Sequence, residues 1–241
     1  MKANDGYGVC KEDTKTLKYS IDLHTHTMYS GDSSTTVEEY LQGFSRAGLS
    51  LAAITDHLTI QGAVAIKGIL GEKIVVGQEI RVKEGELIGL YLSERISPGL
   101  SGKVAAQAIH SQGGLVYIPH PGDKTRASMS QASLMTLINE GYVDVVEVGN
   151  SKLDRSSLSQ EVVAEILETG AALASSSDAH VPEALGSSHT VVATLPSCAD
   201  DLKRLLKDPE TILVHNHFDP ARKWRAKIVP SQLGSIRRAT S

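Results

Sequence analysis

The sequence has few of the residues that would indicate a disulfide scaffold or a membrane protein. It contains only 2 cysteines, Cys10 and Cys198, at a spacing that fits neither a metal-binding nor a redox motif. This scarcity excludes a disulfide-rich fold and a zinc finger, and it favours a reducing, cytoplasmic location. No run of about 18 apolar residues is present, so the sequence predicts no membrane span and no membrane partner.

Other absences narrow the chemistry. There is no Gly-x-Ser-x-Gly turn to expose a serine nucleophile, and the glycine-containing run at 62–73 does not fit a phosphate-binding P-loop. The 24 basic and 28 acidic residues give a net charge of −4, which argues against a protein whose main work is to coat nucleic acid. Histidine, by contrast, occurs 9 times and needs an explanation.

Short β-branched runs alternate with amphipathic segments along the chain, which is the pattern of parallel strands joined by helices. Ser101 and Ser159 are suitable helix caps, and several expected helices end at a glycine. About seven such units predict an α/β fold, a distorted (β/α)7 TIM-like barrel, with an open doubly wound sheet as the alternative. The expected strands are 19–23, 51–55, 73–82, 86–92, 115–119, 143–148, 171–175, 191–195 and 211–214, and the expected helices are 36–48, 101–113, 131–141, 159–170 and 199–207.

The chain is expected to form one domain over residues 18–218. Residues 1–17 are interpreted as a flexible lead-in, and residues 219–241 as a basic tail with six Lys or Arg against one Asp. Segments 58–72 and 121–133 are interpreted as loops, and specificity is expected to depend on them.

Histidines and acids stand at the ends of the expected strands. In a barrel of parallel strands these ends open onto one face, so residues far apart in sequence converge there. Imidazoles and carboxylates without thiolates suit zinc, manganese or iron, and several carboxylates in one place need more than one cation to offset their repulsion. The residues concerned are His24, His26, Asp56, His57, Glu79, His120, Glu147, Asp178 and His180.

The islands His-x-His, Thr-Asp-His, Gly-x-Glu, Pro-His-Pro and Ser-Asp-Ala-His, in this order, resemble the PHP family of polymerase-and-histidinol-phosphatase metallohydrolases. The resemblance covers residues from about 20 to about 195. It implies a distorted barrel and up to three divalent metals. The first metal would be held by His24, His26, Asp178 and a bridging Glu79, the second by Glu79, His120 and either Glu147 or Asn150, and the third by Asp32, His57 and His180.

Clustered divalent metals activate a water and stabilise in-line displacement at phosphorus. The predicted function is therefore a phosphoesterase acting on a small phosphomonoester, and the resemblance suggests histidinol phosphate or a nucleoside monophosphate. Asp178, His57 and His180 are the expected catalytic residues, with either histidine as proton donor to the leaving group. Asp56 is expected to orient His57. The candidate contacts to the substrate phosphate are Arg126, Lys124 and Arg81.

Two alternatives remain open at this point. One is a nuclease acting on short nucleic acids, for which the basic tail is the only support in the sequence. The other is a non-catalytic metal-binding module. A small phosphorylated substrate is the favoured partner over nucleic acid, and the sequence predicts no oligomeric state.

Overall fold

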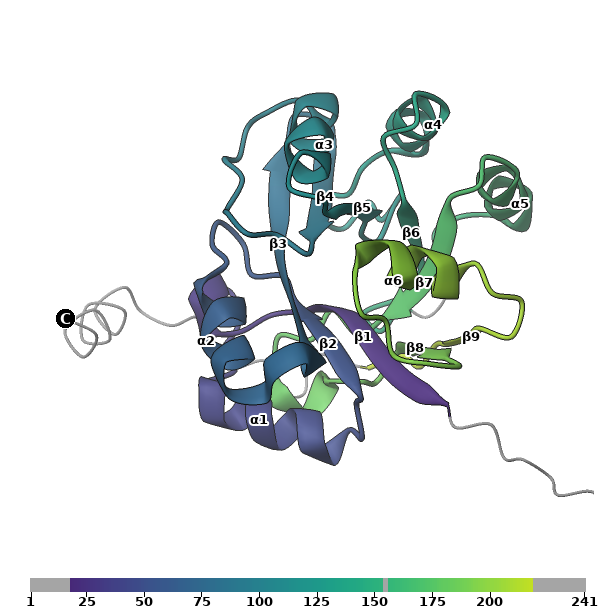
Figure 1. Ribbon diagram of the computed structural model, residues 1–241. Helices are drawn as coiled ribbons and strands as arrows, with labels where there is room; N and C mark the ends of the chain where they lie inside the picture. The colour runs from purple at the N-terminus through teal and green to yellow at the C-terminus, as the bar shows by residue number, and fades with distance from the viewer. Residues whose placement is uncertain (1–17, 154–155, 219–241) are drawn as a thin grey trace, which may run out of the picture.

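The computed structural model describes residues 18–153 and 156–218, so the predicted lead-in and basic tail lie outside the described residues. Figure 1 shows strands in the centre and helices around them. Within the described residues, all nine expected strands and all five expected helices are present, together with one further α-helix and three short 3-10 helices. The strands are β1 Tyr19–Thr25, β2 Leu51–Ile54, β3 Ile74–Val82, β4 Gly85–Leu90, β5 Leu115–Ile118, β6 Val145–Asn150, β7 Ala172–Ser176, β8 His189–Val192 and β9 Ile212–Val214. The helices are α1 Val37–Arg46, α2 Gln61–Leu70, α3 Gly102–His110, α4 Gln131–Asn139, α5 Gln160–Glu168 and α6 Ala199–Leu206.

The strands form one curved sheet in the order β7-β6-β5-β4-β3-β2-β1-β8-β9. β1, β2 and β3 are parallel to one another, as are β5, β6 and β7. The sheet curls until the loop after β7 meets β1. There the Asp178 N–H donates to the carbonyl of His24 at 2.8 Å, and the His26 N–H donates to the carbonyl of Ala179 at 2.9 Å. This nearly closed arrangement confirms the distorted barrel rather than the open sheet.

Strand β4 is antiparallel to both of its neighbours, which the sequence analysis does not predict. Val82 pairs with Gly85, so only Lys83 and Glu84 separate β3 from β4. A two-residue turn cannot hold a crossover helix, and β4 is antiparallel to β3 and β5. The mouth of the barrel is therefore formed by the carboxyl ends of the parallel strands but by the amino-terminal end of β4.

The ends of the helices follow the residues expected to cap them. The hydroxyls of Ser101 and Ser159 accept hydrogen bonds from backbone N–H groups in the first turns of α3 and α5. The glycines that follow four helices have left-handed φ angles between 65° and 83°, a region that glycine enters without strain. These are Gly48, Gly113, Gly141 and Gly170.

The interpretation of 58–72 as a loop is wrong, because most of this segment is helix α2. Two glycines weaken its helix propensity, and no side chain caps its start at Ile60. Tertiary packing stabilises the helix instead, since Ala63 and Ile66 are fully buried and α2 packs against β3. At Gly62 a Cβ atom would lie 2.2 Å from Asp56 Oδ2, so this position leaves no room for a side chain.

Each helix buries one face against the sheet. Helix α6 is an example, with Leu202, Leu205 and Leu206 buried and the acidic residues of its first turn near solvent. In the part of the chain that the structure describes, no helix has both the length and the apolar character that crossing a bilayer requires.

Asp144, directly before β6, joins three elements at the end of the barrel opposite the mouth. Its carboxylate accepts hydrogen bonds from His110 Nε2 at 2.8 Å, from Lys203 Nζ and from the Val116 N–H at 2.9 Å. Burial alone would raise the pKa of Asp144, but these three donors outweigh burial and lower the pKa.

We expect Asp144→Asn to lower the free energy of unfolding by about 1–2 kcal/mol at pH 7, because an amide cannot satisfy these donors. A carboxyl whose pKa is lowered by folding stabilises the protein above its unfolded-state pKa, near 4, and this stabilisation is lost as the pH falls through the native-state pKa. Urea unfolding of both proteins should show the difference at pH 7 and its decrease below about pH 4. A difference that stays constant down to about pH 3 would contradict this role.

Candidate metal centre

Eight of the nine predicted ligands form one cluster at the mouth of the barrel. The cluster consists of three overlapping groups, in each of which the potential ligand atoms lie within 4.8 Å of one another. The groups share most members with the sets that the family resemblance implies, but His26 also joins the group of Asp32, and His24 joins that of Glu79 and His120. The three groups are His26, Asp32, His57 and His180; His24, Glu79 and His120; and His24, His26 and Asp178.

The strands and the turns after them place these side chains. His24 and His26 stand two residues apart at the end of β1, and both are completely buried. β3 is longer than β2, so Glu79 within β3 comes level with His57 beyond the end of β2. His120 and Asp178 follow β5 and β7 with φ angles of 33° and 51°. These left-handed conformations are strained for residues with a side chain and are typical of functional sites.

Glu79 is the centre of the cluster. Its Oε2 lies 3.1 Å from Nε2 of both His24 and His26, and its Oε1 lies 3.1 Å from Nε2 of His120. Burial on its own would raise the pKa of Glu79. The positive charge of His24 and the hydrogen bonds from the imidazoles outweigh burial and hold that pKa well below its usual range. The two oxygens of one ionised carboxylate thus face different imidazoles, as a bridging ligand requires.

Four of the five imidazoles share one orientation, with Nε2 toward the other ligand atoms and Nδ1 toward an oxygen. Such outer contacts fix the ring and leave Nε2 available as a ligand. The Nδ1 partners are Glu147 Oε1 for His24 at 3.3 Å, Ser30 Oγ for His26 at 3.1 Å, Ser128 Oγ for His120 at 2.7 Å and the carbonyl of Asp178 for His180 at 2.9 Å. The sequence analysis does not identify Ser30 or Ser128, because a serine in a turn carries no distinctive signal.

The donor set fits divalent metal ions. Nε2 of His24 and Nε2 of His26 are 3.0 Å apart, and two nitrogens at that distance must share a proton or a cation. Burial and the nearby charge of His180 lower the pKa of His26 to about 3, so its imidazole is neutral, which is the form that binds metals. Nitrogen and carboxylate oxygen donors without thiolates suit zinc, manganese or iron.

Glu147 lies beside the cluster, and both of its oxygens are engaged. Oε1 accepts from the Tyr117 hydroxyl at 2.9 Å and faces Nδ1 of His24, while Oε2 accepts from the His120 N–H at 2.6 Å and from Asn150 Nδ2 at 2.9 Å. These contacts orient the imidazole of His24 and fix the backbone at His120. A direct bond from Glu147 or Asn150 to a metal stays a prediction.

Glu86 is a residue that the sequence analysis missed. Its Oε2 lies 4.0 Å from Nε2 of His120, and its Oε1 accepts a hydrogen bond from Arg81 at 3.1 Å. Burial and the charge of Glu79 raise the pKa of Glu86. Glu86 stands near the start of its strand, whereas the predicted ligands stand at strand ends. Because β4 is antiparallel, its first residues lie at the mouth of the barrel. The short polar turn Lys83–Glu84 between two apolar runs was the available signal.

The cationic side chains predicted to meet the phosphate occupy different places. Arg126 lies over the cluster and bonds the carboxylate of Asp178, whereas Arg81 pairs with Glu86 at the rim and is 60% exposed. Lys124 is exposed and does not line the mouth. Lys152, which the sequence analysis missed, extends to Asp178 Oδ1 at 3.0 Å. A lysine in a turn after a strand belongs to no motif that would single it out.

Asp56 does not orient His57 in the way the sequence suggests. Its two oxygens accept hydrogen bonds from the backbone N–H and the hydroxyl of Thr27, both at 2.6 Å. Burial raises the pKa of Asp56 to about 7. Asp56 therefore fixes the turn that follows His26, while Nε2 of His57 faces Asp32 at 3.3 Å.

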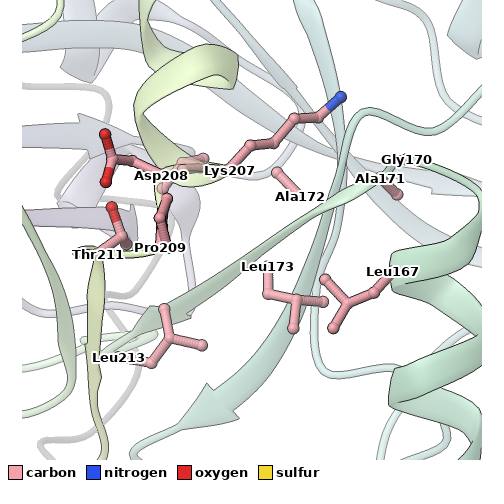
Figure 2. A pocket seen from close by; sticks show the side chains of 11 residues that line it. Leu167, Gly170, Ala171, Ala172, Leu173, Lys207, Asp208, Pro209, Thr211 and Leu213 are labelled. Atoms are coloured by element: carbon pink, nitrogen blue, oxygen red, sulfur yellow. The ribbon is translucent and has the colours of Figure 1, made fainter.

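A cavity of about 260 Å³ opens over the cluster. It is lined by Asp32, His57, Glu79, Arg81, Glu86, His120, Arg126, Ala127, Lys152, Asp178 and His180. A second cavity, of about 390 Å³, lies at the opposite end of the barrel, where β7 and β9 begin. Figure 2 shows that Leu167, Leu173 and Leu213 line it together with Lys207 and Asp208. Its lining contains one carboxylate, that of Asp208, and no histidine or cysteine, and it includes no residue of the three ligand groups, so the mouth is the candidate reaction site.

Comparison with known proteins agrees with this geometry. The sequence model of the PHP domain family matches residues 22–217. An uncharacterised protein of Methanocaldococcus jannaschii is 31% identical over 163 residues, which are 66% of this chain and 65% of the relative. A second uncharacterised protein of that organism is 42% identical over 113 residues, 42% of this chain and 66% of the relative. The chain thus covers about two thirds of the length of each. A Shewanella sediminis protein named probable phosphatase is 26% identical over 231 residues, covering 82% of this chain and 93% of the relative.

Solved structures share the fold. A two-domain protein from Bacteroides vulgatus, described as containing a predicted PHP-like metal-dependent phosphoesterase, superimposes with a TM-score of 0.65 and 18% identity, covering 83% of this chain and 65% of that chain. A lesion-specific endonuclease from Pyrococcus furiosus has a TM-score of 0.62 and 17% identity, covering 92% of this chain and 66% of that chain.

Proposed function

Because the chain belongs to the PHP domain family, we propose that it is a metal-dependent phosphoesterase that hydrolyses a small phosphomonoester. The observation that carries the proposal is the position of Glu79. Its ionised carboxylate faces Nε2 of three imidazoles within 3.1 Å at the mouth of the barrel. A buried cluster of this kind matches the site expected for hydrolysis at phosphorus.

The three groups of the cluster would hold up to three divalent ions of zinc, manganese or iron. Glu86 would complete the group of His24, Glu79 and His120, since its carboxylate faces His120 from across the cavity. Glu147 would orient His24 from the other side. Divalent ions bound there would lower the pKa of a water and neutralise charge on the phosphate oxygens.

The side chains around the cavity supply the remaining functions. Arg126 and Lys152 would bind the non-bridging oxygens of the phosphate, because both line the cavity beside Asp178. Either His57 or His180 would donate a proton to the leaving oxygen. With 26% of its side chain exposed, against 6% for His180, His57 has the better access to a substrate.

The cavity supports a small substrate. Its volume of about 260 Å³ is below the range of about 300–1,000 Å³ typical of drug-sized ligands, and none of its lining residues is a phenylalanine, tyrosine or tryptophan. A base-stacking platform is therefore missing from this lining. A compact ester such as histidinol phosphate fits these features, and a nucleoside monophosphate would extend its base beyond the cavity. We place the activity in the cytoplasm, as the scarcity of cysteine predicts.

The likeness to an endonuclease structure gives the nuclease alternative a specific observation in its favour. The basic residues predicted to support it, at 219–241, lie outside the described residues. The activity assay should therefore include both small phosphomonoesters and short oligonucleotides.

The proposal is tested by stripping the purified protein with a chelator and reloading it with Mn²⁺ or Zn²⁺. We expect release of phosphate from small monoesters in the reloaded protein and at most about a hundredth of that rate in the stripped protein. Nucleotide release from short oligonucleotides without monoester hydrolysis would favour the nuclease. Metal binding without either activity would favour the non-catalytic module and overturn the proposal.

A further inference from the structure

Asp178 is the ligand candidate with the most cationic surroundings. On one side its Oδ1 faces Nε2 of His24 at 3.4 Å and Nε2 of His26 at 3.5 Å, within the metal-binding groups. On the other side Lys152 Nζ lies 3.0 Å from the same oxygen and 2.9 Å from Nδ1 of His180, and the Arg126 guanidinium bonds Oδ2. One carboxylate thus lies between the metal position and two cationic side chains.

We propose that Arg126 and Lys152 compete with the metal for Asp178 and so couple metal loading to anion binding. Before loading, the two cations neutralise the carboxylate. After loading, the metal neutralises it, and the two side chains are available to an anion in the cavity. This inference rests on the proposed function only in that the anion is the phosphate group of a substrate or product.

The positions of Arg126 and Lys152 allow each side chain to contact either Asp178 or an anion in the cavity. Both line the cavity and are partly exposed, Arg126 by 21% and Lys152 by 20%, so an anion can reach them without a change of the fold. Arg126 is also held by Asp123, whose Oδ2 accepts from its Nε at 2.7 Å. The guanidinium therefore keeps its place over the cavity when the metal takes over Asp178. Lys152 has a flexible stem that can turn its ammonium group to a new partner.

The charges around Asp178 determine whether these side chains strengthen or weaken metal binding. A cation about 3 Å from a carboxylate ligand weakens the binding of a second cation, because the metal must displace it or tolerate its repulsion. Removing Lys152 or Arg126 should therefore tighten metal binding, although both residues line the reaction site. By linkage, an anion that attracts the two side chains away from Asp178 should also tighten metal binding, and the metal should tighten anion binding by the same factor.

The test is calorimetric titration of the stripped protein with Mn²⁺, with and without inorganic phosphate. Without phosphate, Lys152→Gln is expected to bind Mn²⁺ about tenfold more tightly than the unchanged protein. Adding phosphate should increase the Mn²⁺ affinity of Lys152→Gln by a smaller factor than it increases that of the unchanged protein. Lys83→Gln makes the same change of charge at an exposed position of the β3–β4 turn, outside the cavity lining, and should bind Mn²⁺ as the unchanged protein does.

Arg126→Gln is the second variant. Like Lys152→Gln, it should bind Mn²⁺ more tightly than the unchanged protein without phosphate, and it should gain less Mn²⁺ affinity when phosphate is added. Unchanged or weaker Mn²⁺ binding by Lys152→Gln would overturn the competition. The outcome is distinguishable from failure of the proposed function, because these titrations involve no turnover. A protein that shows the coupling but releases no phosphate from any monoester would refute the activity and leave the coupling standing.

Discussion

Replacing Glu79 by glutamine is expected to reduce phosphate release by about 10³-fold or more and to remove most of the bound metal. The amide keeps the size of the side chain but has no charge, and its NH₂ group cannot act as a ligand. The four close contacts of the Glu79 carboxylate all involve imidazole Nε2 atoms, so its loss affects every group of the cluster. Steady-state phosphate release and elemental analysis of the purified variant measure the two effects.

Glu72→Gln is the matched control, since it makes the same change on a side chain that is 92% exposed on the outer surface. It should retain the activity and metal content of the unchanged protein. If Glu79→Gln kept full metal content and more than about a tenth of the rate, Glu79 would not be a bridging ligand.

Asp22→Asn is expected to have the largest effect on stability. Asp22 is completely buried in β1, beneath the cluster. Its carboxylate accepts hydrogen bonds from the N–H of Ser177 at 3.0 Å, from the Ser177 hydroxyl at 2.5 Å and from the N–H of Gly186 at 3.0 Å. It therefore fixes the loop that carries Asp178 and His180 against the strand that carries the first ligands.

An asparagine at this position would either point its NH₂ group at the N–H and O–H donors of the loop or leave some of these donors without an acceptor. Burial raises the pKa of Asp22 to about 6, so the cost of burying its charge offsets part of the benefit of these hydrogen bonds at pH 7. We therefore expect the free energy of unfolding at pH 7 to fall by about 1–3 kcal/mol, and metal affinity to fall with it, because the loop loses its attachment. Asp200→Asn, at an exposed position of α6, should change stability by no more than about 0.5 kcal/mol. Urea unfolding of the stripped proteins measures the difference. Equal stability of Asp22→Asn and the unchanged protein would show that the loop is held by other contacts.

The ligands that the sequence reveals share a simple physical reason. His24, His57, His120 and Asp178 each stand at or just after the end of a parallel strand, and the geometry of a barrel brings all such ends together. The rule needs only the strand positions, which the β-branched runs indicate well. It therefore predicts both the barrel and most of the cluster.

What the sequence analysis missed depends on strand direction and on three-dimensional contacts. Glu86 enters the site because β4 is antiparallel, and Lys152 because a turn after β6 passes over Asp178. Helix α2 forms although its local propensity is low, because packing of Ile66 against the barrel outweighs two glycines. None of these features repeats at a fixed sequence spacing, so periodicity and motif matching cannot detect them.

We infer that one cluster at the mouth of the barrel binds the metals. Anomalous diffraction from crystals loaded with Zn²⁺ tests it most directly. We expect metal peaks about 2.0–2.2 Å from Nε2 of His24, His26 and His120, with the Glu79 carboxylate touching more than one of them. Metal peaks elsewhere in an active, metal-loaded crystal, with none at these residues, would contradict it.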